Sequence, residues 1–220
     1  MILYKEWLKT RWFLAAAALV LAGATGYALL SVSKTIQING ADKLWAMLLF
    51  KETVLIGTLQ YIPALLGGLL AAFQFVPETA RKRLKLTLHL PFPQGAMIGL
   101  MSLYGVLVLT LLFALQTGVL ALVLRRWFVS ELVARMLLTS VPWLTAGYAA
   151  YLWVAALCLE PSWRARIVLL LLLSALLRIL FLSNIPESYN PFLPGLVAYV
   201  CGGVLLLYRG VARFKEGIQD

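Results

Sequence analysis

Six long runs of apolar residues, nearly free of charged side chains, constrain this chain more than any other feature of its sequence. The hydrocarbon core of a bilayer is about 30 Å thick, and roughly 20 apolar residues of α-helix are needed to cross it. The fold class we expect is therefore an all-α integral membrane protein, a single domain over residues 1–220. Its six membrane-spanning helices are expected at residues 12–33, 53–77, 91–124, 136–159, 167–185 and 192–208.

The composition excludes a water-soluble domain. Hydrophobic residues make up 62% of the 220 residues and charged residues 13%, whereas soluble domains carry about 25% charge. Two cysteines, Cys158 and Cys201, are too few for a disulfide scaffold, and the single histidine, His89, excludes a histidine-rich metal site. The net charge of +10 comes from short basic stretches between the apolar runs. This distribution is typical of membrane orientation signals and not of a nucleic-acid-binding surface.

The lysines and arginines also predict the orientation of the chain. With the N-terminus inside the cell, twelve of the 19 fall in cytoplasmic segments and six in outer segments, and Arg178 lies inside a span. Cytoplasmic loops of membrane proteins carry the excess of basic residues. We therefore expect both termini in the cytoplasm.

Residues 1–12 are interpreted as an amphipathic helix lying in the membrane interface. In a helix, the apolar residues share one half of the wheel: Leu3, Tyr4, Trp7, Leu8 and Trp12. The polar residues share the other half: Lys5, Glu6, Lys9 and Thr10. Such a helix would place its tryptophans among the lipid headgroups. The alternative is a plain basic flank that orients the first span.

The polar segment at residues 78–90, after the second span, combines cations with leucines. Leu84 and Leu88 share one helical face, and Arg81 and Lys85 share another. The leucines also alternate with polar residues as in a strand, but a helix is favoured because no partner strand is in view. Facing the cytosol, this helix would dock on a soluble partner or rest on anionic membrane lipid.

Three further features concern the membrane interior. Arg178 lies inside the fifth span, where a charge costs at least about 2.5 kcal/mol at a helix centre, so it is a candidate for a transport pathway. Alternatively, the fifth span ends early and Arg178 extends to the outer headgroups. Residues 183–194 contain three prolines and predict a broken outer segment. Pro63 and Pro142 lie inside the second and fourth spans and are expected to bend them.

Two rows of small residues have the spacing of helix contacts. Ala18, Ala22 and Gly26 line one face of the first span, and Ala64, Gly68 and Ala72 line one face of the second. Such rows let helices approach each other closely. They predict helix–helix interfaces, either within the chain or between subunits.

No catalytic constellation is recognisable in the sequence. The acidic residues of the cytoplasmic segments are scattered singly, and one histidine supplies no catalytic dyad. We therefore expect no catalytic residue, no cofactor and no metal site in this chain. The alternatives left open are a membrane-embedded enzyme of lipid-headgroup chemistry and a non-transporting scaffold or accessory subunit.

Taken together, these features resemble the permease subunits of type-2 ATP-binding-cassette exporters. The likeness covers the whole chain in topology and residues 73–91 in motif. In that family a glutamate and basic residues follow the second span, then a leucine-rich coupling helix, and a proline opens the third span. The residues standing in the coupling positions here are Glu78, Arg81, Lys82, Arg83, Leu84 and Leu88, with Pro91 after them.

The resemblance implies a partner and a mechanism. Residues 78–90 would form a coupling helix that sits in a cleft of a separate nucleotide-binding ATPase subunit, which binds ATP and Mg. Closure of that subunit would move substrate across the membrane. The resemblance also implies a dimer with a second permease copy or a paralogue, with spans one and five near the two-fold axis. The implied location is the plasma membrane, as a multi-pass protein of the bacterial inner membrane; the substrate is not indicated.

Overall fold

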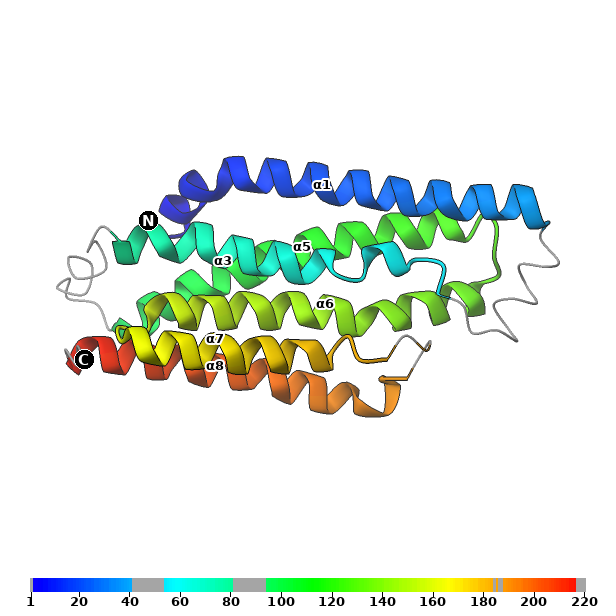
Figure 1. The fold of residues 1–220 in the computed structure, drawn as a ribbon. Helices are drawn as coiled ribbons and strands as arrows, with labels where there is room; N and C mark the ends of the chain where they lie inside the picture. The colour runs from blue at the N-terminus through cyan, green and yellow to red at the C-terminus, as the bar shows by residue number, and fades with distance from the viewer. Residues whose placement is uncertain (1, 41–53, 81–93, 184, 186–187, 217–220) are drawn as a thin grey trace.

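The computed structural model describes residues 2–40, 54–80, 94–183, 185 and 188–216, and the regular secondary structure of these residues is helical. The helices in chain order are α1 (Ile2–Asn39), the 3-10 helix η1 (Gly57–Leu59), α3 (Ile62–Ala80), α5 (Gln94–Leu124), α6 (Ser130–Leu159), α7 (Trp163–Ile179), the 3-10 helix η2 (Asn190–Phe192) and α8 (Leu193–Glu216). They run side by side along one common direction (Figure 1). The all-α fold class expected from the sequence is thus present in the described residues.

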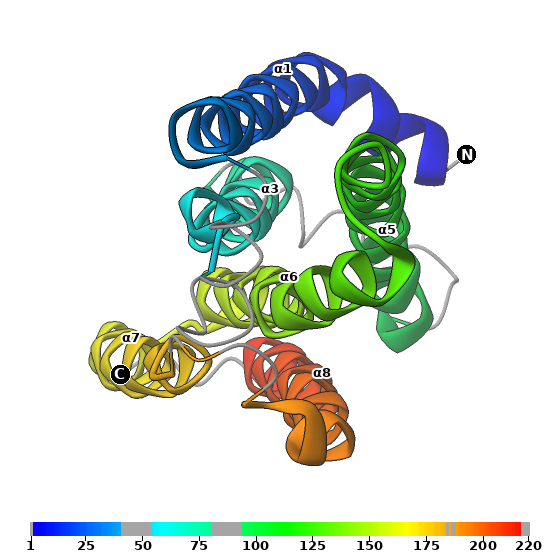
Figure 2. The same ribbon diagram turned by 90° about the vertical axis from the view of Figure 1, so that its right-hand side faces the viewer.

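Helix α6 occupies the centre of the bundle (Figure 2). It packs against α3, α5, α7 and α8, while α1 packs on α3 and α5. The two chain ends lie at the same end of the bundle (Figure 1). We call this the terminal end and the other the distal end. The terminal end is where α3 and α6 finish and where α5 and α7 begin.

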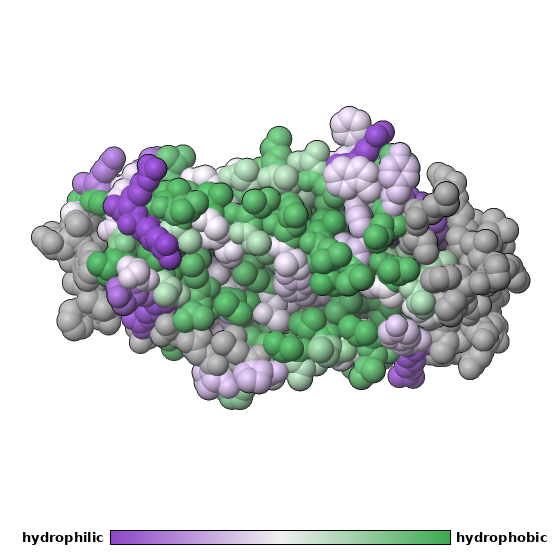
Figure 3. Space-filling model, turned by 180° about the vertical axis from the view of Figure 1, so that it is seen from behind, coloured by the Kyte–Doolittle hydropathy of each residue, from purple (hydrophilic) through white to green (hydrophobic). Residues whose placement is uncertain are grey.

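The helices indicate a multi-pass membrane protein. Four helical segments of the described chain are long and apolar enough to cross a membrane: Leu3–Ile38, Gly57–Thr79, Gly95–Leu124 and Ser130–Leu159. A shorter apolar stretch, Pro194–Gly210, lies in α8. Hydrophilic side chains gather near the two ends of the molecule, and the surface between them is mostly hydrophobic (Figure 3). Such an apolar belt is stable in a lipid environment, because contact of this surface with water would cost free energy.

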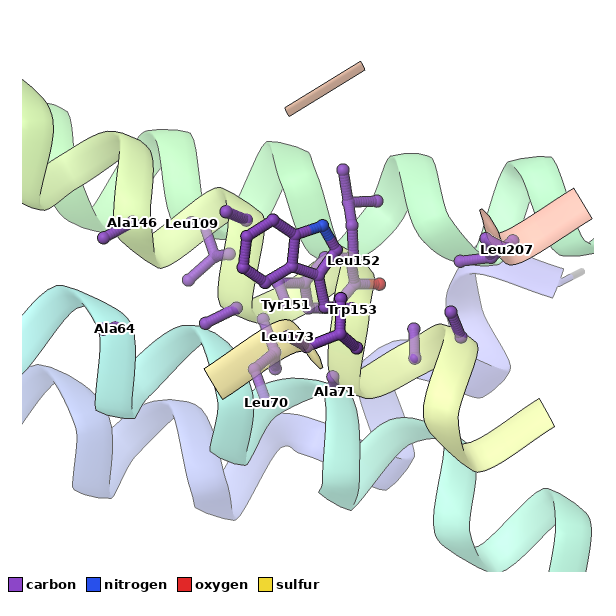
Figure 4. Close-up of a cluster of buried hydrophobic side chains, with 14 of the residues drawn as sticks. Ala64, Leu70, Ala71, Leu109, Ala146, Tyr151, Leu152, Trp153, Leu173 and Leu207 are labelled. Carbon is purple, nitrogen blue, oxygen red and sulfur yellow. The ribbon is translucent and has the colours of Figure 1, made fainter. Parts of the chain in front are cut away.

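The main hydrophobic core forms around the second half of α6. Tyr151, Leu152 and Trp153 lie there beside Leu70 of α3 and Leu173 of α7 (Figure 4). All five are nearly inaccessible to solvent. The core therefore ties α3, α6 and α7 into one unit.

Glycines allow the close contact between α3 and α6. A Cβ on Gly67 would overlap the carbonyl of Gly147, and a Cβ on Gly147 would lie 2.7 Å from Phe113 Cζ and 2.9 Å from Pro63 O. Separations under 3 Å are not tolerated for real side chains, so only glycine permits this approach. The α3–α6 contact is the most extensive in the bundle.

The structure sets several helix ends differently from the apolar runs. α1 is one helix from Ile2 to Asn39, so the stretch expected to lie in the interface forms its first turns. Figure 2 shows these turns at an angle to the rest of α1. Gly40 ends α1 with φ +75°, and its N–H donates to Ile36 O at 3.0 Å.

The helices found in the second and fifth apolar runs also differ from the expected spans. The second run contains η1 before α3 begins at Ile62, so Pro63 lies in the first turn of α3. A proline is accommodated there without breaking a helical hydrogen bond, so Pro63 lies at the start of α3 and not in its interior, where the bend was expected. α7 ends at Ile179, six residues before the expected end at 185. α7 and α8 stop well short of the distal end reached by α1, α5 and α6 (Figure 1).

A candidate functional site where the first turns of α1 meet the end of α3

Glu78 lies in the last turn of α3 and makes ion pairs with the first turns of α1. Its Oε1 is 2.8 Å from Lys5 Nζ and 3.2 Å from Lys9 Nζ. The Glu78 side chain is 3% exposed, whereas that of Lys5 is 46% exposed. The carboxylate is therefore directed at α1 and is shielded from solvent.

A second carboxylate completes the charge cluster, which we define as Lys5, Glu6, Lys9 and Glu78. Lys9 Nζ lies 2.9 Å from Oε2 of the fully buried Glu6. Two lysines and two glutamates make the cluster neutral overall. Neutrality matters because a buried charge is tolerated only when it is paired and hydrogen-bonded.

Helical spacing brings the four residues together. Lys5 and Lys9 are four apart, and Glu6 and Lys9 are three apart, so all three lie on one side of the first turns of α1. This polar side faces the bundle. The apolar side, with Tyr4 67% exposed and Trp12 76% exposed, faces outward. The expected amphipathic pattern is present, and in a membrane its apolar side would meet lipid.

Hydrogen bonds continue from the charge cluster into α5. The Thr10 hydroxyl donates to Glu6 O at 2.9 Å and lies 2.7 Å from the Tyr104 hydroxyl. Thr10 is fully buried and Tyr104 is 8% exposed. α1 is thus joined by polar contacts to α5 as well as to α3.

A neighbouring polar side chain on α3 makes hydrogen bonds to α5 and α6. Gln74, one helical turn before Glu78, donates from Nε2 to Met101 O at 2.8 Å. The Tyr151 hydroxyl donates to Gln74 Oε1 at 2.8 Å. Gly105 leaves the space that the Tyr151 ring occupies, since a Cβ there would overlap it. The last two turns of α3 are therefore held by α1, α5 and α6 at once.

Another side of the end of α3 borders a groove of about 600 Å³ between α3, α6 and α7. Val76 and Thr79 of α3 line it together with Trp163 and Arg166 of α7. The Nε of Arg166 donates to Glu160 O at 2.7 Å, which holds the start of α7 against the end of α6. A displacement of the end of α3 would therefore alter both the charge cluster and this groove.

Of the residues expected in the coupling segment, the structure places only Glu78. The other five lie outside the described residues: Arg81, Lys82, Arg83, Leu84 and Leu88. Residue 81 follows directly on Ala80, where α3 ends. Glu78 thus belongs to both the charge cluster and the expected coupling segment, and two helical residues separate it from Arg81.

The two small-residue rows have different surroundings. Ala64 is buried, and a Cβ on Gly68 would make ordinary contact with Val154 Cγ2 at 3.6 Å, so this row packs on α6. Ala72 is half-buried beside them. On α1, Ala18 and Ala22 are exposed, and a Cβ on Gly26 would meet nothing within 4 Å. Among the described residues, only the row on α3 is used for close packing.

Arg178 lies in the last turn of α7 and is exposed. Because α7 ends at Ile179, the residue sits at a helix end and not in the middle of a span. A cation in the last turn is favoured by the helix dipole. This position corresponds to the alternative in which the fifth span ends early.

The partners of Glu78 could not be singled out from the sequence. The sequence indicates only the polar half of an amphipathic stretch for Lys5, Glu6 and Lys9. No pattern in it relates these residues to the end of α3. A signal for Gln74 is present, since an amide within an apolar run needs a hydrogen-bonding partner in a membrane. Lys9 and Lys5 precede Glu78 by 69 and 73 positions, so no local sequence pattern could indicate that these residues pair.

Within the described residues, no group of three or more His, Cys, Asp and Glu side chains is placed to hold a metal ion. Cys158 and Cys201 are both free thiols. Comparison with protein-family models, curated proteins and solved structures gives no match to this chain.

Proposed function

We propose that this chain is the membrane-spanning permease subunit of an ATP-driven exporter. A separate nucleotide-binding ATPase subunit binds ATP and Mg and closes on residues 78–90. The permease itself carries no catalytic site and moves substrate in response to that closure. Six spans, cytoplasmic termini, a second permease copy or paralogue, and a bacterial inner membrane belong to the same proposal.

The observation that carries the proposal is the attachment of the end of α3. The charge cluster, Gln74 and Thr79 connect the last turns of α3 to α1, to the bundle centre and to the groove beside α7. Residues 81–90 continue directly from this point. A push on that segment would therefore be transmitted to several helices, as coupling to an external motor requires.

Glu78 has a specific role in this proposal. Since its carboxylate binds Lys5 and Lys9, it does not present its charge to a partner protein. It joins the first turns of α1 to the start of the coupling segment. Contact with the ATPase subunit is left to Arg81, Lys82 and Arg83 and to the leucines Leu84 and Leu88.

Charge reversal at the coupling segment tests the proposal. The full chain is purified under mild conditions from native membranes, and the ATP hydrolysis that accompanies it is measured. We expect the double variant Arg81→Glu/Arg83→Glu to lose most of this activity, because like charges or lost ion pairs weaken docking. The matched control, Arg125→Glu/Arg126→Glu, reverses two adjacent cations at the distal end and should retain it.

Two outcomes contradict the proposal. The first is the absence of any ATP hydrolysis with the wild-type chain. The second is equal retention of hydrolysis by both double variants, which would show that residues 81–83 make no contribution to docking.

A further inference from the structure

The groove of about 600 Å³ between α3, α6 and α7 has an uneven lining. Arg166, in the first turns of α7 at the terminal end, is the charged side chain among the lining residues that the structure describes, and Trp163 lies beside it. Farther along α7 the lining is apolar, with Ile167, Leu170 and Leu171 exposed. A cation at one end of an apolar groove suits a molecule with an anionic head and an apolar chain.

The apolar part continues along α7 toward the middle of the bundle. A second hollow of about 190 Å³ shares Leu157 and Leu170 with the first and extends to Ser174 and Leu177. We call the two together the α7 groove. From Arg166 to Leu177 it follows α7 for about 16 Å at 1.5 Å per residue, close to half of the roughly 30 Å hydrocarbon core. The α7 groove thus has the depth of one leaflet.

The guanidinium of Arg166 is fixed in position. Its Nε donates to Glu160 O at 2.7 Å. Its two Nη groups donate to none of the described residues, and they are accessible in a half-buried side chain. The N–H groups of a guanidinium form a fork that matches a phosphate group, and less freedom is lost on binding when the fork is already oriented. Arg166 differs in this from Arg164, which is exposed and outside the lining.

The charge of the groove favours an anionic headgroup over a zwitterionic one. Glu160 is 3% exposed and does not line the groove, and it meets Arg166 through its backbone carbonyl. Of the lining residues that the structure describes, none is acidic. The groove therefore offers a partner to a phosphate group but none to the ammonium group of phosphatidylcholine.

The surroundings favour a membrane lipid over a soluble anion. Trp163 is 69% exposed at the start of α7, as is typical of a tryptophan among lipid headgroups. Leu170 and Leu171 are 53% and 62% exposed. An acyl chain would cover these leucines, whereas a soluble phosphate compound would leave them bare.

We propose that the α7 groove binds one anionic phospholipid from the leaflet at the terminal end. Its phosphate group accepts hydrogen bonds from the Nη groups of Arg166, and one acyl chain lies along α7 as far as Leu177. The site needs neither the ATPase partner nor the charge cluster.

Photolabelling with two matched lipids tests the headgroup. The full chain is reconstituted in phosphatidylcholine nanodiscs with a trace of phosphatidylglycerol or phosphatidylcholine that carries a photoreactive group in one acyl chain. Phosphatidylglycerol should label α6 and α7 peptides about fivefold more than phosphatidylcholine does, the effect of one cation at the membrane surface. Labelling of α5, on another side of the bundle (Figure 2), measures the general attraction of anionic lipid to a basic protein.

Neighbouring arginines provide the matched pair of variants. Arg166→Gln should reduce the preference on α6 and α7 to the value found on α5, whereas Arg164→Gln removes an adjacent exposed cation and should leave the preference unchanged. Arg166→Lys keeps the charge and should retain more of the preference than Arg166→Gln. An equal effect of Arg164→Gln and Arg166→Gln would overturn the proposal, because general attraction would then explain the labelling.

A second pair of variants tests the acyl chain and leaves Arg166 intact. Ser174→Phe fills the apolar part of the groove and should abolish the preference for phosphatidylglycerol on α6 and α7. Ala175→Phe adds the same ring at an exposed position outside the lining and should change nothing. Thermal unfolding shows that the variants compared are folded. An unchanged preference in Ser174→Phe would mean that the headgroup alone is bound, and it would overturn the proposed lipid site.

A second copy of this chain is the competing occupant. Nanodiscs holding one chain or two are separated by mass and labelled side by side. We expect equal labelling of α6 and α7 by phosphatidylglycerol per chain, including where copies associate through another face. Loss of this labelling in two-chain discs would assign the groove to a second copy. None of these measurements involves ATP hydrolysis, so their outcome is separate from the test of coupling.

Discussion

Glu78 is the residue on which the proposed coupling depends most directly. It is the carboxylate that both lysines of the charge cluster contact, and it stands two residues before the end of α3. Its partner Lys9 is only 18% exposed, so water cannot fully replace the missing anion if Glu78 is neutralised. The cost of such a change arises because Glu6 would be left as the one carboxylate of the cluster beside two lysines, so that the cluster is no longer neutral.

We therefore expect Glu78→Gln to destabilise the protein. The loss should be between about 1 and 3 kcal/mol, the value of a charge-assisted hydrogen bond that is removed. Thermal unfolding in detergent micelles measures it as a lowered midpoint. Glu131→Gln removes an exposed carboxylate in the first turn of α6, where only the helix dipole favours it, and should lower the midpoint less than Glu78→Gln does. Equal midpoints for wild type and Glu78→Gln would show that the cluster contributes nothing to stability.

At the scale of single helices, the contact between α3 and α6 depends on glycine. Gly67 and Gly147 face each other, and Gly147 also meets the ring of Phe113. The ring and the carbonyl of Pro63 both lie within 3 Å of the point that a Cβ at Gly147 would occupy. Neither the backbone nor the buried ring can move away without disturbing its neighbours.

Gly147→Ala should accordingly lower stability by about 1–3 kcal/mol through overpacking. Gly118→Ala, in open surroundings on α5, should leave stability unchanged or raise it by up to about 1 kcal/mol, because alanine is the better helix former. Thermal unfolding of the two variants side by side gives the comparison. A neutral Gly147→Ala would mean that α3 and α6 lie farther apart in the membrane than the close glycine contact requires.

Helix boundaries show which elements could be predicted from the sequence. α5 was expected at residues 91–124 and is found at 94–124, because an uninterrupted apolar run of this length is typical of a membrane-spanning helix. α6 begins at Ser130, six residues before the expected 136, since Glu131 and Arg135 interrupt the apolar run without interrupting the helix. Apolar composition therefore locates the centre of a span better than its charged ends.

On the scale of the whole molecule, the bundle has two unequal parts. α1, α5 and α6 reach the distal end, whereas α7 and α8 stop short of it and are joined by the segment around η2 (Figure 1). A cavity of about 130 Å³ separates this segment from the middle of α6, with Ser183 and Tyr189 facing Pro142 and Thr139. The three prolines of residues 183–194 predict this irregular backbone.

The orientation of the whole bundle is tested by cysteine labelling in intact cells. In a background of Cys158→Ala/Cys201→Ala, we expect Lys85→Cys and Gln219→Cys to react with a membrane-impermeant maleimide only after the cells are opened. Lys43→Cys and Arg126→Cys should react from outside. These expectations follow from the excess of basic residues at the terminal end. Reaction of Lys85→Cys in intact cells would contradict both the orientation and the proposed ATPase contact.

The sequence by itself determined the all-helical class of this protein, the four long apolar helices and the amphipathic character of its first turns, because each depends on the composition and periodicity of a short stretch of chain. Only the tertiary structure decided that Glu78 binds Lys5 and Lys9, that the row on α3 packs while the row on α1 faces a groove, and that Gln116 Oε1 accepts no hydrogen bond from the described residues. The physical reason is that lipid and core are equally apolar: Leu19 is 74% exposed and Leu70 is 0% exposed, yet both are leucines in spans. Hydrophobicity alone therefore does not tell which side of a membrane helix faces its neighbours.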